Sequence, residues 1–171
     1  GSAVFTVKAK EYPTFTANDT TSCKGMPSTV KVKTGNADYY TWTWHNNGKQ
    51  ESINGTSYSE ILTATRTYQL TGTKEGCTTT PITVTANVNE LPILTINSKQ
   101  NIGETPITMC FNDIDTLIVS GANDYTWSNN SGLTQNNERS NEAEIMPTSV
   151  GEHIYSVTGT DLNNCTNTQD I

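Results

Sequence analysis

The sequence predicts an all-β protein made of two tandem immunoglobulin-like β-sandwiches. Three observations support this: short runs of β-branched residues, turn signals between those runs, and one pattern of residues that occurs twice along the chain. No stretch shows sustained helical periodicity.

The expected strands are short segments rich in Val and Thr whose polarity alternates with a period of two, as in half-buried strands. Turn sequences such as NNGK (46–49) and KEG (74–76) separate them. The expected strands cover residues 4–10, 29–35, 67–73, 82–88, 115–121 and 154–160.

The chain repeats one unit of about 85 residues, which is the size of a single domain. TYQLTGT (67–73) returns as IYSVTGT (154–160), and GNADYYTW (35–42) returns as GANDYTW (121–127). A buried Trp and a Tyr at a strand corner are features of immunoglobulin-like sandwiches.

We therefore expect two immunoglobulin-like domains, at residues 12–90 and 91–171. The chain stops soon after Cys165, where the last strand of the second domain should begin, so that strand is expected to be truncated. Residues 1–11 are expected to be either the trailing strand of a preceding module or the first strand of repeat 1.

Four cysteines occupy matching places in the two repeats. Cys23 to Cys110 is 87 positions, and Cys77 to Cys165 is 88 positions. Wide, matched spacing favours a disulfide framework, Cys23–Cys77 and Cys110–Cys165, over a zinc site or four buried free thiols. Because disulfides persist in oxidising compartments, the protein is expected to be extracellular.

Composition and charge argue against several classes of function. The net charge of −7 lacks the basic footprint of a nucleic-acid-binding protein. No apolar run approaches the roughly 20 residues that span a bilayer, so membrane insertion is not expected. The initial Gly-Ser resembles a cloning scar, which suggests an excised fragment whose targeting signals lie outside it.

The repeated Cys, Gly-x-x-Asp-Tyr, Trp, Tyr-x-aliphatic-x-Gly-Thr and Cys landmarks resemble the immunoglobulin-like repeats of large surface adhesins of gliding bacteria, of SprB type. The resemblance covers nearly the whole chain. It implies export by the type IX secretion system, display on the cell surface and no catalytic residues. Repeat 2 departs from the pattern at Asn164, where a Gly is usual, and in a longer connection at 97–106.

The sequence contains no convincing catalytic or metal site, and we expect neither an enzyme nor a cofactor. His45 and His153 have no apparent catalytic partner, and no spacing of carboxylates singles out an acid–base pair. Residues 112–115 and 161–164 offer oxygen ligands for calcium but lack the register of a known calcium loop, so turn chemistry is favoured.

Trp44 is the best candidate for a ligand surface. Tyr40, Trp42 and Trp44 share one face of a strand, and only the first two recur in repeat 2, as Tyr125 and Trp127. Trp44 is therefore free to lie near the surface, where it would stack on a sugar or simply cover the end of the sandwich.

We thus expect a stalk segment of an exported adhesin involved in adhesion or gliding motility. The alternatives are a carbohydrate-binding accessory module with Trp44 as its platform, or a spacer of an exported polysaccharide-degrading enzyme. Expected partners are neighbouring modules of the same long chain and surface polysaccharide. Head-to-tail strand exchange between fragments, with residues 5–10 as the donated strand, is also expected.

Overall fold

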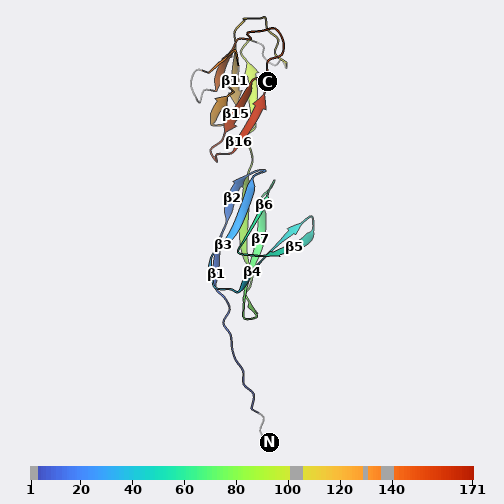
Figure 1. Ribbon diagram of the computed structural model, residues 1–171, viewed down its shortest axis with the longest axis vertical. Helices are drawn as coiled ribbons and strands as arrows, with labels where there is room; N and C mark the ends of the chain where they lie inside the picture. Colours follow the sequence, from blue (N-terminus) through green and yellow to red (C-terminus); the bar gives the residue numbers. More distant parts are fainter. Residues whose placement is uncertain (1–3, 101–105, 129–130, 136–140) are drawn as a thin grey trace. The chain divides into compact units, whose positions relative to one another are not determined.

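The computed structural model describes residues 4–100, 106–128, 131–135 and 141–171, and it confirms the all-β fold (Figure 1). The chain divides into two compact units, Gly1–Asn89 and Glu90–Ile171. They are called module 1 and module 2 here, and each is described by itself. Within the described residues, no helix is long and apolar enough to cross a membrane.

Module 1 is a sandwich of a three-stranded sheet, β1-β3-β6, and a larger sheet, β2-β9-β7-β4-β5, with β8 also paired to β7. All pairs are antiparallel except β2 with β9. The strands are β1 (Phe15–Asn18), β2 (Thr20–Cys23), β3 (Pro27–Gly35), β4 (Tyr39–Asn46), β5 (Lys49–Asn54), β6 (Ser57–Ile61), β7 (Arg66–Lys74), β8 (Cys77–Thr78) and β9 (Ile82–Asn89).

Module 2 pairs a four-stranded sheet, β10-β11-β14-β13, with a three-stranded sheet, β12-β15-β16. The strands are β10 (Thr95–Ser98), β11 (Asp115–Ser120), β12 (Asp124–Trp127), β13 (Leu133–Gln135), β14 (Glu142–Ile145), β15 (Ser156–Thr160) and β16 (Thr166–Asp170). β4 and β12 carry the repeated Trp, and β7 and β15 carry the repeated Gly-Thr.

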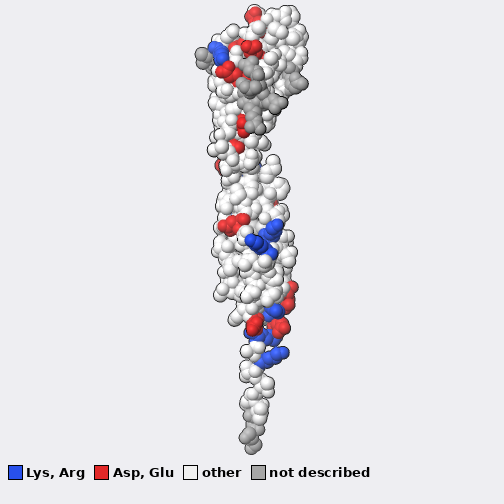
Figure 2. All heavy atoms as spheres, turned by 90° about the vertical axis from the view of Figure 1, so that its left-hand side faces the viewer, with Lys and Arg blue, Asp and Glu red and all other residues white. Residues whose placement is uncertain are grey.

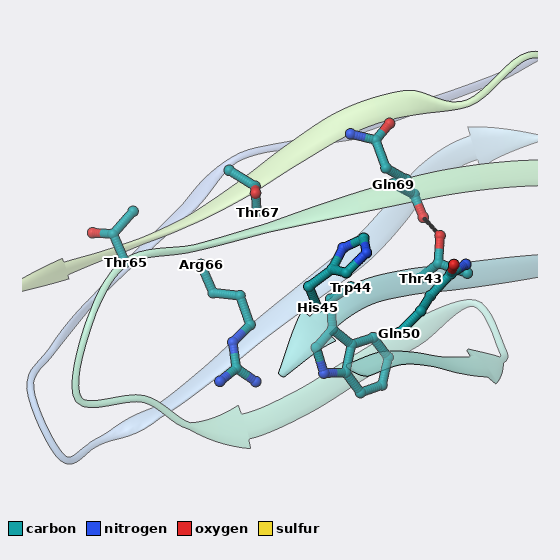
Figure 3. A pocket seen from close by; sticks show the side chains of 8 residues that line it. All are labelled: Thr43, Trp44, His45, Gln50, Thr65, Arg66, Thr67 and Gln69. Carbon is teal, nitrogen blue, oxygen red and sulfur yellow. Dashed lines mark hydrogen bonds between the residues drawn. The ribbon is translucent and has the colours of Figure 1, made fainter. Parts of the chain in front are cut away.

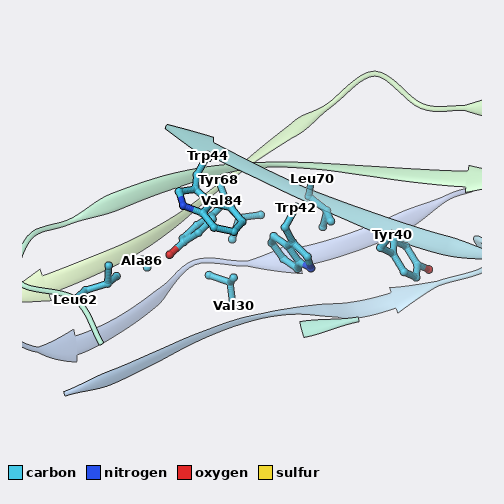
Figure 4. Close-up of a cluster of buried hydrophobic side chains, with 9 residues drawn as sticks. All are labelled: Val30, Tyr40, Trp42, Trp44, Leu62, Tyr68, Leu70, Val84 and Ala86. Carbon is cyan, nitrogen blue, oxygen red and sulfur yellow. The ribbon is translucent and has the colours of Figure 1, made fainter. Parts of the chain in front are cut away.

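Alternation along the strands builds one core between the sheets of each module. In module 1, Trp42 and Leu70 are fully buried and pack with Val30 of the facing sheet (Figure 4). In module 2, Trp127 and Val157 pack with the facing Leu117 in the same way. Burying such side chains contributes roughly 1.5–3 kcal/mol each, so these repeated positions dominate the stability of each sandwich.

A tyrosine in each module fastens the turn that precedes its Trp-bearing strand. The hydroxyl of Tyr40 accepts a hydrogen bond from the Ala37 N–H at 3.3 Å. The hydroxyl of Tyr125 accepts from the Ala122 N–H at 2.8 Å and donates to the Ala122 carbonyl at 2.7 Å. In each module the tyrosine two residues before the buried Trp thus closes this turn and also belongs to the core.

The predicted disulfides Cys23–Cys77 and Cys110–Cys165 are wrong. Cys77 and Cys110 are free thiols, whereas Cys23 and Cys165 are disulfide-bonded. In module 1, Cys23 lies opposite Asn89, and Cys77 lies opposite Lys74, at the other end of the antiparallel β7–β9 pair. Roughly 30 Å of strand separates these positions, and a disulfide requires Cα atoms within about 7 Å.

The same geometry separates the two cysteines of module 2. Cys165 lies in the turn after β15, where its carbonyl accepts from the Asp161 N–H at 3.0 Å. That turn directly follows Thr160, which pairs with Asp124 at the start of β12. Because β12 begins just after β11 ends, Cys165 lies near the carboxyl end of β11. Cys110 precedes β11, so about 20 Å, the length of that strand, lies between them.

The sequence also led to an expectation about each end of the chain. Residues 4–12 are exposed and form no strand, so residues 5–10 are not the first strand of repeat 1, which is β1 from Phe15. An extended segment without a paired neighbour is not stable as a strand. At the other end, β16 pairs along the whole of β15. β16 has five residues where β9 has eight.

Candidate ligand-binding groove

A groove of about 420 Å³ opens on module 1 where β4 and β7 separate. The β4–β7 ladder ends at the Thr43–Gln69 pair, whereas the β4–β5 hairpin continues to Asn46 and Lys49. The space beyond the last β4–β7 pair is therefore flanked by the hairpin on one side and by the start of β7 on the other (Figure 3). Its lining residues are Thr43, Trp44, His45, Gln50, Thr65, Arg66, Thr67 and Gln69.

Trp44 lines this groove but is not the exposed platform that the sequence suggested. Its side chain lies on the inward face of β4 and is only 6% exposed. The indole stacks on Tyr58 with ring centroids 4.6 Å apart and meets Tyr68 edge-on at 5.8 Å. These contacts hold the ring in the core. Among the described residues its Nε1 has no hydrogen-bond partner, so a buried donor is left over beside the groove.

Polar side chains on the outward face of the sheet form the rim. His45 on β4 is directly opposite Gln50 on β5, and both are exposed. On the other side, the Thr43 hydroxyl donates to the Gln69 backbone carbonyl at 3.2 Å (Figure 3). The side-chain amide of Gln69 also lies on the rim, and its nitrogen donates to the Thr83 hydroxyl at 3.1 Å. Amides, hydroxyls and an imidazole offer both donors and acceptors to a ligand.

The positive charge of Arg66 is neutralised from within the module. Its Nη1 lies 2.8 Å from both carboxylate oxygens of Glu60, and the Tyr68 hydroxyl donates to the same carboxylate. Burial, and then the hydrogen bond to Glu60, raise the pKa of Tyr68 well above its ordinary value. Burial and the Glu60 charge also raise the pKa of Tyr58. With Arg66 paired, the groove offers mainly uncharged hydrogen-bonding groups.

The other candidate residues take part in local structure. His153 Nε2 lies 2.9 Å from the Ser149 carbonyl oxygen. In the proposed calcium segments, Asp161 accepts from the N–H groups of Asn163 and Cys165 at 2.8 Å, and buried Asp115 accepts from the Thr116 N–H at 2.6 Å. The Asp161 carboxylate thus acts in a turn, and the Asp115 carboxylate bonds to backbone at the start of β11. Across the described ranges, no group of three or more His, Cys, Asp or Glu side chains is placed to hold a metal ion.

The sequence identified Trp44 but missed the polar rim. Thr43 and His45 alternate with Trp42 and Trp44, so the period-two pattern already placed them on the opposite face. The contributions of Gln50 and Gln69 depend on the registers of two ladders, which no local pattern encodes. The divergence of β4 from β7, which makes the groove, also has no local sequence signal.

Charged side chains do not gather into a patch of one sign on the face drawn in Figure 2. Lys and Arg there lie beside Asp and Glu, and most of the surface is uncharged. This agrees with a charged fraction of only 16%.

The sequence matches no protein-family model and no curated protein. Solved structures similar in fold include the I-band fragment I67–I69 from titin, at 13% identity with a TM-score of 0.41, and Dpr2 Ig1–Ig2 in complex with DIP-Theta Ig1–Ig3, at 13% with 0.38. The chain is covered to 95% and 94% in these matches and spans 65% and 63% of the matched chains.

SGBP-B of the Bacteroides ovatus mixed-linkage glucan utilization locus, solved in complex with a mixed-linkage heptasaccharide, is also similar in fold. It is 18% identical with a TM-score of 0.31, and the match covers 94% of this chain and 46% of that one. Similarity at this level carries no information about ligand or activity.

Proposed function

We propose that the chain is a stalk segment of an exported cell-surface adhesin, in which each module positions its neighbours rather than performing chemistry. The observation that carries the proposal is the repeated framework. Trp42 and Trp127, and likewise Leu70 and Val157, take equivalent places in two separate cores. Arrays of complete, similar modules are typical of structural chains.

The proposal extends to location and partners. The resemblance of both repeats to modules of gliding-bacterial adhesins supports display on the cell surface through type IX secretion, with neighbouring modules of the same long chain as the main partners. A disulfide-bonded pair of cysteines supports an oxidising, extracellular environment. No enzymatic activity is proposed. In the alternative role, as a spacer of an exported polysaccharide-degrading enzyme, the modules would likewise have to hold their neighbours apart.

The stalk role is tested by replacement in the full-length protein. Two unrelated immunoglobulin-like modules of the same total length would replace residues 12–171, and a second strain would lack these residues altogether. A stalk segment requires length and not identity, so cell attachment should survive the replacement and fall in the deletion. Loss of attachment in both strains, with normal surface levels, would show that these two modules make specific contacts.

A second function is supported by the groove on module 1. We propose that the groove binds a short neutral oligosaccharide, because its rim presents uncharged donors and acceptors and Trp44 contributes an unpaired buried N–H. This differs from the stacking role expected for Trp44, since the indole would act through its edge.

Variants of the groove separate this function from folding. Trp44→Phe keeps an aromatic ring in the stack and removes only the N–H, and Gln69→Ala removes a rim amide. Each variant should weaken binding on a glycan array while leaving the thermal unfolding midpoint within a few degrees of wild type. Thr29→Ala, on the opposite sheet, is the control. If wild type binds no glycan, the groove function is wrong and the stalk role is unaffected.

A further inference from the structure

The sequence contains two Asn-Gly pairs, Asn47–Gly48 and Asn54–Gly55, which neither proposed function uses. The first is the turn that precedes β5, and the second lies where β5 ends. An asparagine followed by glycine is open to attack on its side-chain amide by the next backbone nitrogen, because glycine has no Cβ to hinder the approach. The two pairs have the same chemistry, but the structure holds them in different ways.

Hydrogen bonds to β4 hold the Asn54–Gly55 pair. The Asn54 Oδ1 accepts from the Thr41 hydroxyl at 2.8 Å, and the Gly55 N–H donates to the Tyr40 carbonyl at 3.0 Å. The Gly55 carbonyl accepts from the indole N–H of Trp42, which is fully buried, at 3.0 Å. The amide of Asn54 and the nitrogen of Gly55 are therefore both fixed, with the Gly55 N–H directed at the backbone of β4.

The Asn47–Gly48 pair forms the loop of the β4–β5 hairpin, whose last strand pair is Asn46 with Lys49. Asn47 has a φ of 49° and Gly48 a φ of 77°, as in a type I′ turn. Both residues are exposed, on a hairpin that projects from module 1 (Figure 1). Within the described part of the chain, neither the Asn47 side chain nor the Gly48 N–H has a hydrogen-bond partner. Water therefore reaches both reacting groups.

We propose that Asn47 is a site of spontaneous deamidation in the folded protein, with water as the co-reactant, and that Asn54 is protected. The Gly48 nitrogen attacks Cγ of Asn47, so a new C–N bond forms while the Cγ–Nδ2 bond breaks. The proton of the Gly48 N–H leaves with the departing ammonia. Water then opens the cyclic imide at either carbonyl carbon. The products are aspartate and isoaspartate, and in isoaspartate the main chain continues through Cγ.

The two sites differ in what must move before the reaction. In each pair the glycine nitrogen has to turn toward the asparagine Cγ. At Asn54 this rotation breaks the hydrogen bonds to Tyr40 and Thr41. At Asn47 it distorts only the end of a hairpin whose second strand, β5, is the edge strand of its sheet. Folding should therefore slow the reaction at Asn54 and leave it nearly unchanged at Asn47.

The two products change the groove on module 1 differently. Asp-Gly favours a type I′ turn as Asn-Gly does, so the aspartate product keeps the hairpin and adds a negative charge to it. Isoaspartate instead lengthens the main chain of the loop that sets the register of His45 with Gln50. These two residues line the groove, so isoaspartate should disturb it. Any effect on ligand binding rests on the proposed groove function, but the modification itself does not.

Storage of the full chain in heavy-oxygen water, followed by peptide mapping, tests the proposal. The water that opens the imide leaves its oxygen in the product, so each modified position is labelled. In the folded protein at mildly alkaline pH, Asn47 should react at least about tenfold faster than Asn54, because hydrogen bonds must first break at Asn54. In guanidinium chloride the two rates should become similar. Equal rates in the folded protein, faster reaction of Asn54, or no reaction at Asn47 would overturn the proposal.

Two variants control the assignment. Asn47→Gln keeps an amide but would have to form a larger ring, so it should take up no label at position 47 while Asn54 reacts as in wild type. Asn47→Asp reproduces the aspartate product and should keep the hairpin. The isoaspartate fraction, which has the same charge, should show faster amide hydrogen exchange in β5 than Asn47→Asp. Label at position 47 in Asn47→Gln would refute the imide route, and equal exchange would refute the effect on the groove whether or not the groove binds a glycan.

Discussion

At the scale of single residues, the tyrosines of module 1 serve different purposes that their sequence positions do not distinguish. Tyr40 fastens a backbone turn, and Tyr68 instead donates to the carboxylate of Glu60. The corner tyrosine of immunoglobulin-like sandwiches bonds to backbone, whereas Tyr68, which begins the repeated strand, bonds to a side chain. The burial of Tyr68 was predictable from alternation, but its partner was not, because Glu60 lies on another strand, β6.

The buried Tyr68–Glu60 pair predicts that module 1 loses stability at alkaline pH. The folded-state pKa of Tyr68 is raised above the ordinary value of 10.0. The contribution of Tyr68 to the free energy of unfolding is therefore complete below pH 10. It declines as the pH rises further, because there Tyr68 ionises in the unfolded state and stays protonated in the folded state. The decline is roughly 1.4 kcal/mol per pH unit. Urea unfolding from pH 8 to 12 should show a shallower pH dependence in Tyr68→Phe than in wild type.

Tyr12→Phe is the control for this experiment, because Tyr12 is 67% exposed on the segment before β1. It should reproduce the wild-type pH dependence. An identical alkaline slope in wild type and Tyr68→Phe would show that Tyr68 ionises as easily in the folded state as in the unfolded one.

At the scale of elements, the hairpins before Cys77 and Cys165 solve one conformational problem with two different residues. Gly76 has a φ of 87°, and Asn164 has a φ of 60°, both in the left-handed region. Asn is among the few non-glycine residues that visit this region readily. The departure from Gly at position 164 therefore keeps a left-handed residue directly before the cysteine, although the sequence alone marked it as a break in the repeat pattern.

The turn predicts a small, local loss of stability on alanine substitution. Asn164→Ala should destabilise module 2 by roughly 1–2 kcal/mol, because a residue with a Cβ is strained at this φ and alanine lacks the local hydrogen bonding of asparagine. Asn164→Gly should be close to neutral. Amide hydrogen exchange of β15 and β16 measures the effect, and unchanged protection in Asn164→Ala would contradict it.

Gly76→Ala is a useful parallel, since no atom lies within 4 Å of a Cβ built there. Any loss of stability in Gly76→Ala therefore comes from the backbone conformation and not from a steric clash. It should appear as faster amide hydrogen exchange in β7 and β9, with no change in module 2.

The alternation of apolar and polar residues predicted where the long strands lie, but it did not predict which strands pair with one another. The segments expected at 29–35, 67–73 and 82–88 became β3, β7 and β9, because their β-branched residues face a core. Residues 4–10 have the same pattern and remain unpaired. A period of two reports that a segment fits a sheet, but whether a neighbouring strand is available is decided elsewhere in the molecule. The groove on module 1 likewise depends on where the β4–β7 ladder ends.

At the scale of the whole molecule, the cysteines show why matched sequence positions need not be contact partners. Cys23 and Cys77 recur as Cys110 and Cys165, which suggested one bridge inside each repeat. In a sandwich, however, the two positions of each repeat fall at opposite ends of antiparallel strands. Spacing along the chain gives loop length, and only strand direction gives distance in space.

The structure therefore predicts one disulfide and two thiols, instead of two disulfides. Under denaturing, non-reducing conditions the intact mass should lie about 2 Da below the all-thiol value, because each bridge removes two hydrogens. Iodoacetamide should then label Cys77 and Cys110, and peptide mapping should leave Cys23 and Cys165 unlabelled. Cys77→Ser and Cys110→Ser should each change stability by less than about 0.5 kcal/mol, since neither thiol is fully buried. Cys165→Ser should destabilise module 2 clearly more, because Cys165 is fully buried and bonded. A mass about 4 Da low with no labelled cysteine would restore the pairing within each repeat and require both strand registers to be wrong.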